Sequence, residues 1–489
     1  MESGQKLIES YQLRVNDVIV GVAIFSDEKE PVPLYNISIT NISETTKIIL
    51  EKIRQEFISQ ETQYVEAEGQ PETTVIQTQF KKSILVLLQK YFPTANKKTI
   101  DMLINYIMQQ NIGLGHIEIL LKDTNLEEIV INNADEPVWV YHRKHGWLKT
   151  NIYMPNEARI RYYSTVIGRD IGKEITVLSP LMDAHLKTGD RVNATLRPIS
   201  SKGNTITIRK FAAKPWTITD FLKEKTISYE AAALLWSAVQ NELSFLIAGG
   251  TASGKTSMLN VAANFFPPNQ RIISLEDTRE LMLPDILHWV PLETRLPNPE
   301  GKGGITMLDL VVNSLRMRPD RIMVGEIRRR AEAEVLFEAM HTGHSVYGTL
   351  HANNIRETVN RLTQPPIGLP KQILSALSLI IVQNINRRNG KRRTLQIGEI
   401  MHDGDARILM QLNAAKDTLE KLNEPAAIYE TLNLYTGFSK EEVEKDMEEK
   451  INILKWMVAS DISDINRIGL IMSKYYRKQP FMNTATNRV

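Results

Sequence analysis

The sequence contains no cysteine, and its positive and negative charges nearly cancel. Without cysteine the chain cannot form disulfides or thiolate metal sites, which agrees with a cytoplasmic protein. The 59 basic residues are almost balanced by 57 acidic ones, which gives a formal net charge of +2. Composition therefore does not favour a nucleic-acid-binding protein, and any basic surface has to be local.

Long hydrophobic runs are absent as well. A membrane-spanning helix needs about 20 apolar residues in succession. The most apolar early segment, residues 15–25, is shorter and contains Asn16 and Asp17. The N-terminus also lacks the basic stretch followed by an apolar one that marks a secretory signal. We expect a cytoplasmic protein that associates with the cell membrane only peripherally, through partners.

The chain is long enough for two or three domains, because it has 489 residues of which 42% are hydrophobic. From about residue 218 onward, helix and strand signals alternate, which is typical of a parallel sheet covered by helices. Signals of an α+β domain precede this region, and helix signals follow it. The pattern predicts an N-terminal region of unknown role over 1–79, an α+β domain over 80–212, a hinge over 213–217, an α/β domain over 218–410 and a helical subdomain over 411–489.

Local signals mark some of these connections. Pro215 biases Lys214 away from helical conformation, so a hinge is expected there. Asn389-Gly390 lies between two apolar runs and predicts a β-hairpin with a type I′ turn. Ser439 and Glu442 have the spacing of a capping box, which predicts the start of a helix in the C-terminal subdomain.

The most specific motif is a phosphate-binding loop. The chain matches the pattern G-x-x-x-x-G-K-[ST] directly after the apolar run Leu243–Ala248. Glycines let successive N–H groups turn toward phosphate oxygens, and the helix that follows offers its positive N-terminus. We expect Lys255 to contact the β- and γ-phosphates of ATP and Thr256 to bind Mg²⁺. The predicted nucleotide-binding residues are Gly249, Gly250, Thr251, Ala252, Ser253, Gly254, Lys255, Thr256 and Ser257.

Hydrolysis also requires carboxylates for Mg²⁺ and for the attacking water. The apolar segment Arg321–Val324 is followed by Gly325 and Glu326, as in a Walker B strand, although such strands usually end in aspartate. We expect Glu326 to act on Mg²⁺ through water or on the attacking water. Glu276 and Asp277 follow another predicted strand. Because ligands of an open α/β sheet bind beyond the carboxyl ends of its strands, we expect both side chains at the same site.

Three of the nine histidines, His341, His344 and His351, lie within eleven residues. A zinc site is one interpretation, but no cysteine is available and a predicted strand separates His351 from the other two. We expect His344 and His351 to hydrogen-bond around the nucleotide, to sense the γ-phosphate or to brace a subunit interface. Ordinary buried histidines are the alternative.

Taken in order, these motifs resemble the secretion ATPase superfamily. Its members drive type II secretion, type IV pili, DNA-transfer type IV secretion and archaeal filaments. The resemblance covers residues from about 111 to 400, and its most specific parts are the phosphate loop, Glu276-Asp277, Gly325-Glu326 and Thr342–Asn353. Gly113–Ile117, Val138–Asn151 and Thr205–Phe211 resemble the archaeal branch, which assembles pili and assembles or rotates the archaellum. The lack of cysteine weighs against the bacterial members that carry a four-cysteine zinc module.

The resemblance implies an ATP hydrolase with a RecA-like P-loop NTPase core over 218–410. It also implies a homo-hexameric ring in which each nucleotide lies between the N-terminal and C-terminal domains. Arginines of the first domain would reach the phosphates, and the matching candidates are Arg191, Arg197 and Arg209. Such a motor would use ATP and Mg²⁺ to assemble, or also rotate, an archaeal type IV pilus-like filament. The implied partners are an integral membrane platform protein and accessory cytoplasmic proteins.

Other functions remain open. A nucleic-acid or DNA-transfer translocase would use local positive charge at Arg316, Arg318 and Arg321 or over residues 387–393. Those stretches lack interleaved aromatic residues, so nucleic acid is not the expected partner. A nucleotide-gated scaffold would bind ATP but scarcely hydrolyse it. The basic stretch 387–393 is by default a solvated turn, and contact with an acidic partner or with membrane headgroups is the alternative.

Overall fold

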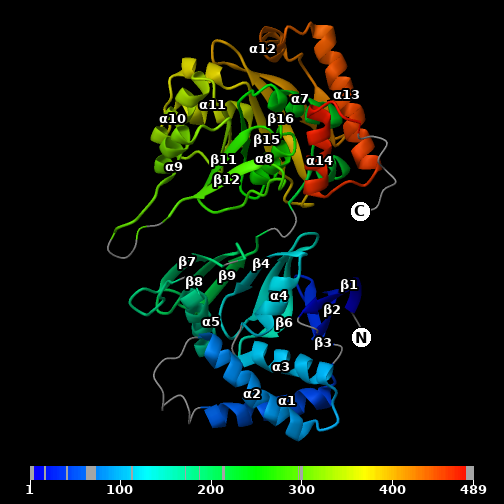
Figure 1. The fold of residues 1–489 in the computed structure, drawn as a ribbon, viewed down its shortest axis with the longest axis vertical. Coiled ribbons are helices and arrows are strands. Elements are labelled where there is room, and N and C mark those ends of the chain that lie inside the picture. The colour runs from blue at the N-terminus through cyan, green and yellow to red at the C-terminus, as the bar shows by residue number, and fades with distance from the viewer. Residues whose placement is uncertain are drawn as a thin grey trace. The chain divides into compact units, whose positions relative to one another are not determined.

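The computed structural model describes residues 5–15, 18–39, 42–61, 73–111, 114–170, 172–186, 188–211, 215–295, 297 and 301–480. The chain divides into unit 1, Met1–Ala213, and unit 2, Lys214–Val489. Each unit contains a nine-stranded sheet. Figure 1 draws the strands of both sheets as arrows. Residues 213 and 214 of the predicted hinge lie outside the described residues. Within the described ranges, no helix combines the length and the apolar character needed to cross a membrane.

The sheet of unit 1 is mainly antiparallel, with the order β1-β2-β3-β6-β5-β4-β9-β8-β7. Its strands alternate buried and exposed residues, so only one face of the sheet packs against a core. Helices α4 (His116–Lys122) and α5 (Glu157–Asp170) supply apolar side chains to that core. The strands are β1 (Gln5–Val15), β2 (Val18–Asp27), β3 (Leu34–Ile39), β4 (Leu126–Ile131), β5 (Pro137–His142), β6 (Gly146–Tyr153), β7 (Leu181–His185), β8 (Arg191–Thr195) and β9 (Thr205–Arg209).

The first three strands belong to this sheet, whereas the sequence predicted a separate region over residues 1–79. Strand β2 pairs with β3, and β3 pairs in parallel with β6. Between β3 and β4 the chain forms α1 (Glu44–Glu61), α2 (Thr73–Tyr91) and α3 (Lys97–Asn111), whose apolar side chains make a cluster of their own. The boundary predicted at residue 79 falls inside α2. These inserted helices separate in sequence strands that are neighbours in space.

A buried carboxylate fixes the N-terminal strands to the rest of unit 1. Asp123 follows α4 and is fully buried. Its Oδ2 accepts hydrogen bonds from the hydroxyls of Tyr11 on β1 and Tyr35 on β3, at 2.5 and 2.6 Å. The ammonium of Lys210, just after β9, donates to the backbone carbonyl of Asp123. Burial lowers the pKa of Lys210 to about 8, although the charge of Asp123 opposes the shift.

Unit 2 has a parallel sheet with an antiparallel extension, in the order β12-β11-β13-β14-β10-β15-β16-β17-β18. Neighbours from β12 to β15 are parallel, and those from β15 to β18 are antiparallel. The strands are β10 (Phe245–Gly249), β11 (Arg271–Glu276), β12 (His288–Glu293), β13 (Arg321–Val324), β14 (Ser345–Leu350), β15 (Leu379–Ile385), β16 (Arg392–Ile400), β17 (Ala406–Asn413) and β18 (Thr418–Lys421). This arrangement confirms the predicted RecA-like α/β core.

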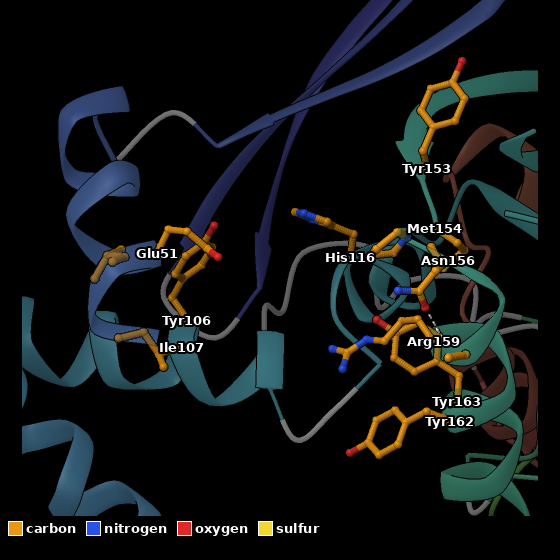
Figure 2. A pocket seen from close by; sticks show the side chains of 13 residues that line it. Glu51, Tyr106, Ile107, His116, Tyr153, Met154, Asn156, Arg159, Tyr162 and Tyr163 are labelled. Carbon is orange, nitrogen blue, oxygen red and sulfur yellow. Dashed lines mark hydrogen bonds between the residues drawn. The ribbon is translucent and has the colours of Figure 1, made fainter. Parts of the chain in front are cut away.

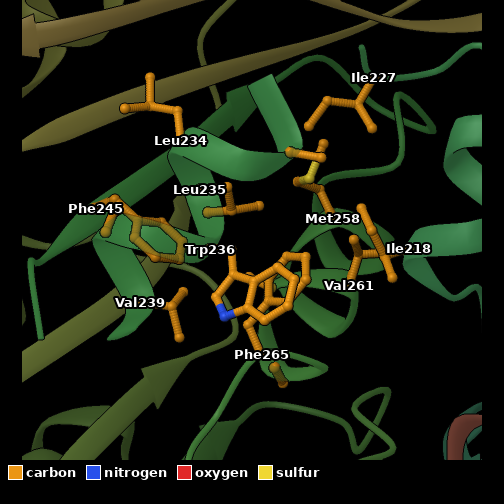
Figure 3. Close-up of a cluster of buried hydrophobic side chains, with 14 of the residues drawn as sticks. Ile218, Ile227, Leu234, Leu235, Trp236, Val239, Phe245, Met258, Val261 and Phe265 are labelled. Atoms are coloured by element: carbon orange, nitrogen blue, oxygen red, sulfur yellow. The ribbon is translucent and has the colours of Figure 1, made fainter. Parts of the chain in front are cut away.

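Helices cover both faces of the parallel strands, which explains why every residue of β10, β13 and β14 is buried. On β10, Phe245 and Ile247 face one apolar cluster, whereas Leu246 and Ala248 face another. The first cluster includes α6 (Ile218–Lys223), α7 (Tyr229–Gln240) and α8 (Lys255–Ala263); part of it, around Trp236, is drawn in Figure 3. The second includes α9 (Met307–Ser314), α10 (Arg330–His341) and α11 (Ile355–Thr363).

The C-terminal helices are α12 (Ala426–Thr436), α13 (Lys440–Ala459) and α14 (Ile465–Tyr476), and they pack into the same cluster as α7 and α8. The predicted capping box is confirmed, because Ser439 and Glu442 cap α13 reciprocally. The predicted boundary at residue 410 falls within β17. The helices begin only after β17 and β18, the last two antiparallel strands of the sheet. Lys450 of α13 is fully buried and donates to Ser237 Oγ of α7 at 3.0 Å, so the packed face of α13 is not purely apolar.

Arg321, one of the arginines considered for nucleic-acid contact, is fully buried at the start of β13. Its guanidinium donates to Gln270 Oε1 at 2.5 Å, to the Val239 carbonyl at 2.8 Å and to the Tyr347 hydroxyl. It also lies over the ring of Phe266, 4.8 Å from the centroid. A side chain enclosed in this way cannot contact nucleic acid. Instead it fixes the start of the strand that leads to Glu326.

The predicted hairpin forms between β15 and β16, but its turn is not type I′. A type I′ turn needs positive φ at both central residues, and of Asn389 and Gly390 only the glycine has one, at 70°. The Gly390 N–H donates to the Asn386 carbonyl at 2.8 Å, and the Asn386 N–H donates to the Lys391 carbonyl at 2.9 Å. These bonds close a connection of six residues, 386–391, in place of the two-residue turn.

Candidate active site

The phosphate loop connects the carboxyl end of β10 to the N-terminus of α8. Gly254 is the N-cap of α8, with φ 93°, and no side chain caps the helix there. The first N–H groups of α8 therefore keep their capacity to bind an anion. A Cβ on Gly249 would lie 2.7 Å from the Gln383 carbonyl oxygen, so only glycine fits at the start of the loop. Ser253 is buried and its hydroxyl donates to the Gly250 carbonyl at 2.8 Å.

Lys255 is folded back onto its own loop. Its ammonium donates to the carbonyls of Gly249 and Gly250, both at 3.0 Å. Burial lowers the pKa of Lys255, and the negative charges of Glu326 and Glu280 oppose this shift. The side chain thus holds a positive charge at the loop, and both carbonyl contacts can be exchanged for phosphate oxygens.

Glu276 ends β11 and is nearly fully buried, with 2% exposure. Its Oε1 accepts hydrogen bonds from the backbone N–H groups of Glu280 and Leu281, at 2.8 and 3.0 Å. Its Oε2 is buried and has no hydrogen-bond partner in the described residues. Burial raises the pKa of this carboxyl to about 7, although the two N–H groups oppose the shift. Glu276 therefore exchanges a proton near neutral pH.

Glu326 and Asp277 are brought together by an arginine that the sequence analysis did not consider. Arg328 donates from Nε and Nη2 to Glu326 Oε2, at 3.0 and 2.8 Å, and from Nη1 to Asp277 Oδ2 at 2.6 Å. Gly325 lies between β13 and Glu326, and a Cβ there would lie 3.4 Å from Glu276 Cγ. The ends of β11 and β13 thus collect three carboxylates at one edge of the sheet.

The histidines separate instead of clustering. His351 directly follows β14, whose Leu350 is in register with Ala248 just before the phosphate loop. His344 precedes β14, and seven residues of extended chain span about 20 Å. It therefore lies at the opposite edge of the sheet, where its Nδ1 contacts the Ala339 carbonyl at 3.3 Å. Within one chain His344 therefore lies apart from the phosphate loop and cannot share a zinc ion with His351, and its role at a nucleotide or a subunit interface stays a prediction.

The three arginines predicted to face the phosphates belong to unit 1. Arg191 and Arg209 lie opposite each other on β8 and β9 and are exposed. Arg191 forms a two-pronged ion pair with Asp183, at 3.0 and 2.6 Å. Exposed Arg197 donates to the Lys202 carbonyl at 3.0 Å. Their role at a nucleotide depends on contact with an ATPase domain and stays a prediction.

Sequence reasoning missed two further neighbours of the phosphate loop. A Cβ on Gly250 would lie 3.2 Å from Asn353 Oδ1. Arg392 Nε, at the start of β16, donates to the Ala252 carbonyl at 3.0 Å. Asn353 stands only two residues beyond His351, which follows a predicted strand. The end of that strand was therefore a signal in the sequence that Asn353 lies near the phosphate loop. Nothing in the sequence pairs Arg392 with a loop 140 residues earlier.

A separate cavity of about 650 Å³ lies in unit 1. In Figure 2, Glu51 and Tyr106 line one side, and Arg159 and Tyr162 line the other. The Arg159 guanidinium lies over the ring of Tyr162, 5.1 Å from its centroid. None of the sequence-predicted site residues lines this cavity. Its volume is that of a ligand pocket, but the residues with nucleotide chemistry are collected at the sheet of unit 2.

Comparison with known proteins identifies the family of this chain. Residues 117–464 match the family model described as "Type II/IV secretion system protein". The uncharacterized protein MJ0900 of Methanocaldococcus jannaschii is 34% identical over 386 residues, which are 76% of this chain and 69% of that protein. The type IV secretion system protein PtlH of Bordetella pertussis is 30% identical over 312 residues, 57% of this chain and 91% of PtlH. The structure of the Legionella pneumophila ATPase DotB aligns with a TM-score of 0.46 at 20% identity, over 73% of this chain and 94% of DotB.

Glu276→Gln should change the pH dependence of stability. The folded-state pKa of about 7 lies above the usual value near 4.5, so the folded protein binds this proton more tightly than the unfolded chain does. That stabilisation is complete below pH of about 4.5 and is lost as pH rises toward 7. The free energy of unfolding, measured by urea titration at several pH values, should therefore fall more steeply between pH 5 and 7 in the wild type than in Glu276→Gln. Parallel curves would contradict the buried, protonated carboxyl.

Proposed function

We propose that this chain, which belongs to the type II/IV secretion system protein family, is an Mg²⁺-dependent ATP hydrolase that powers assembly of a type IV pilus-like surface filament. The observation that carries the hydrolase proposal is the meeting of the phosphate loop after β10 with the carboxylates after β11 and β13 at one sheet edge. In parallel sheets, this edge is where ligands bind.

ATP binding follows from the loop. The nucleotide's phosphates replace the Gly249 and Gly250 carbonyls as partners of the Lys255 ammonium, because an anion attracts it more strongly than a neutral oxygen does. The uncapped N-terminus of α8 supplies further N–H donors. These are charge-assisted contacts, so the loop favours the triphosphate end of the nucleotide over the base.

A magnesium ion fits the residues present. Mg²⁺ at a phosphate site takes most of its ligands from water and phosphate, and needs only one or two protein oxygens. The Thr256 hydroxyl, one residue beyond Lys255, and Glu326 can supply these, the latter through water. The ion would neutralise charge that develops on the phosphates.

Glu326 is the residue that we assign to the attacking water. In the structure its Oε2 accepts two hydrogen bonds from Arg328, which also holds Asp277. Both of these bonds go to Oε2, so Oε1 is the oxygen that we assign to orienting the attacking water molecule. Glu276, buried behind Gly325, supports the strand end, and His351 lies beside the loop.

The quaternary and cellular parts of the proposal rest on the family. A homo-hexameric ring would place Arg191, Arg197 or Arg209 of unit 1 at a nucleotide, where positive charge stabilises the transition state. The filament assignment rests on the archaeal relative MJ0900 and on the motifs shared with the archaeal branch. The partners would then be a membrane platform protein and accessory cytoplasmic proteins, and the motor would also rotate the filament if it is an archaellum.

A second candidate function is a DNA-transfer ATPase of the same family, which the similarity to putative conjugal transfer proteins of Mycobacterium tuberculosis favours. The burial of Arg321 removes one of the charges that such a role would use. The filament proposal therefore stands first, and the scaffold alternative is decided by turnover.

Lys255→Ala should weaken ATP binding about a hundredfold, because a charge-assisted contact with phosphate is lost. Isothermal titration measures the ATP affinity of the variant and of the wild type.

Glu326→Gln should keep ATP affinity within a few-fold but lower kcat by about 10² to 10³, because the group that activates water is neutralised. Isothermal titration measures the affinity, and phosphate release measures kcat. Glu338→Gln, on the exposed face of α10, is the matched control and should change neither. Full turnover in Glu326→Gln would refute the catalytic assignment.

Replacement of Arg191, Arg197 or Arg209 by glutamine should lower kcat more than ATP affinity for the arginine that faces the phosphates, by up to about a thousandfold. Arg169→Gln, on the exposed surface of α5, controls for loss of charge on unit 1. Phosphate release at saturating ATP is the measurement. If all three variants keep wild-type turnover, none of these arginines acts on the transition state.

In the organism that encodes this chain, the Glu326→Gln allele should abolish surface filaments while the protein remains at its normal level. Electron microscopy of whole cells counts the filaments, and immunoblotting checks abundance. Cells that keep their filaments but lose DNA transfer would support the DNA-transfer function in place of filament assembly.

A further inference from the structure

Arg392 makes two contacts with the phosphate loop from a distant part of the chain. It is the first residue of β16, opposite Ile385 on β15. Its Nε donates to the Ala252 carbonyl at 3.0 Å. A Cβ on Gly254 would lie 3.5 Å from Arg392 Cδ, so the aliphatic part of the arginine packs against the N-cap of α8. The side chain therefore covers the turn from Ala252 to the helix start.

The contacted residue has an unusual backbone. Ala252 has φ 60°, in the left-handed region that residues with a Cβ seldom occupy. Gly254, two residues on, has φ 93°. A loop with consecutive N–H groups turned toward an anion needs such conformations, and glycine adopts them without penalty whereas alanine does not. Some other interaction must therefore offset the free-energy cost of the left-handed conformation at Ala252. The hydrogen bond from Arg392 to the Ala252 carbonyl is suited to do so.

Arg392 is itself held in place by its neighbour. Arg393 Nη1 donates to the Arg392 carbonyl at 2.8 Å. Arg393 also forms a two-pronged ion pair with Asp417, at 2.7 and 2.8 Å, in the turn between β17 and β18. Only 12% of the Arg393 side chain is exposed. The antiparallel extension of the sheet thus fixes the backbone from which Arg392 reaches the loop.

These contacts argue against interpreting the whole basic stretch 387–393 as a solvated turn or a membrane contact. Arg392 binds the phosphate loop, whereas Arg393 and Lys391 pair with Asp417. A solvated turn or a membrane contact would leave these charges pointing outward. Arg387 and Arg388 remain at the exposed turn.

We propose that Arg392 is a positioning residue of the nucleotide site, whose guanidinium keeps Ala252 left-handed and so holds the phosphate loop ready for a triphosphate. The proposal rests on the proposed function and deepens it, because it assigns to the antiparallel extension a part in nucleotide affinity. Arg392 acts through the loop and not on the reacting phosphate. Arg392 should therefore raise the affinity of the site for phosphates without changing the rate of the chemical step on bound ATP.

Arg392→Gln in the full-length protein should weaken binding of ATP and of inorganic triphosphate by the same factor, about tenfold, which is the usual loss for a hydrogen bond from a charged group. KM should rise by that factor, and kcat at saturating ATP should stay within about twofold. Arg388→Gln, in the same turn, is the matched control. Arg392→Lys keeps the charge and should recover part of the affinity, and thermal unfolding of each variant checks that the fold is intact. Equal affinities for Arg392→Gln and Arg388→Gln, or a loss confined to ATP, would overturn the proposal.

Ala252→Gly supplies the decisive second variant. Glycine adopts φ 60° without the guanidinium's help, so Arg392→Gln should cost no more than about threefold in affinity when residue 252 is glycine. If the tenfold loss persists in the glycine background, Arg392 contacts the nucleotide itself and the positioning role is wrong. Failure of the wild type to bind ATP would instead refute the proposed function, so the two failures are distinguishable.

Discussion

The candidate site depends on one constraint, the parallel alignment of the buried strands β10, β11, β13 and β14. Parallel strands in register bring all their carboxyl ends to one edge, whatever their order along the chain. The phosphate loop, Glu276, Glu326 and His351 each lie at the carboxyl end of one of these strands or within two residues of it. Helices on both faces bury these strands in two apolar clusters. The same constraint sends His344, which precedes β14, to the other edge.

The parallel alignment of the buried strands explains how much of the fold could be predicted from the sequence. The segment Arg321–Val324 identified β13 to the residue, because strands buried on both faces are mostly apolar. Strand β12 was missed because it is an edge strand, half exposed and interrupted by Pro291. Strands β1 to β3 were missed as members of a sheet because their partners come after three inserted helices. Local pattern identifies an element, but it carries no information on pairing across such a distance.

The site was predicted where chemistry and chain order coincide, and missed where it depends on tertiary contact. Glu276 and Glu326 follow strands, so their position could be deduced from the order of elements. Arg328 stands two residues beyond Glu326, but no pattern indicates that it would bridge to Asp277. Arg392 appeared to be one of several turn charges. Arg328 is positioned by the end of β13, and Arg392 is positioned by the antiparallel extension of the sheet. Both positions depend on the folded sheet and not on a local sequence pattern.

The burial of Asp123 joins segments of unit 1 that are far apart in the sequence. Its carboxylate accepts hydrogen bonds from the hydroxyls of Tyr11 and Tyr35, and Lys210 donates to its backbone carbonyl three residues before the end of unit 1. Replacing this carboxylate by an apolar group would leave the buried Tyr35 hydroxyl without its acceptor, which costs free energy. One residue therefore ties β1, the first strand of unit 1, to the segment that follows β9, its last strand.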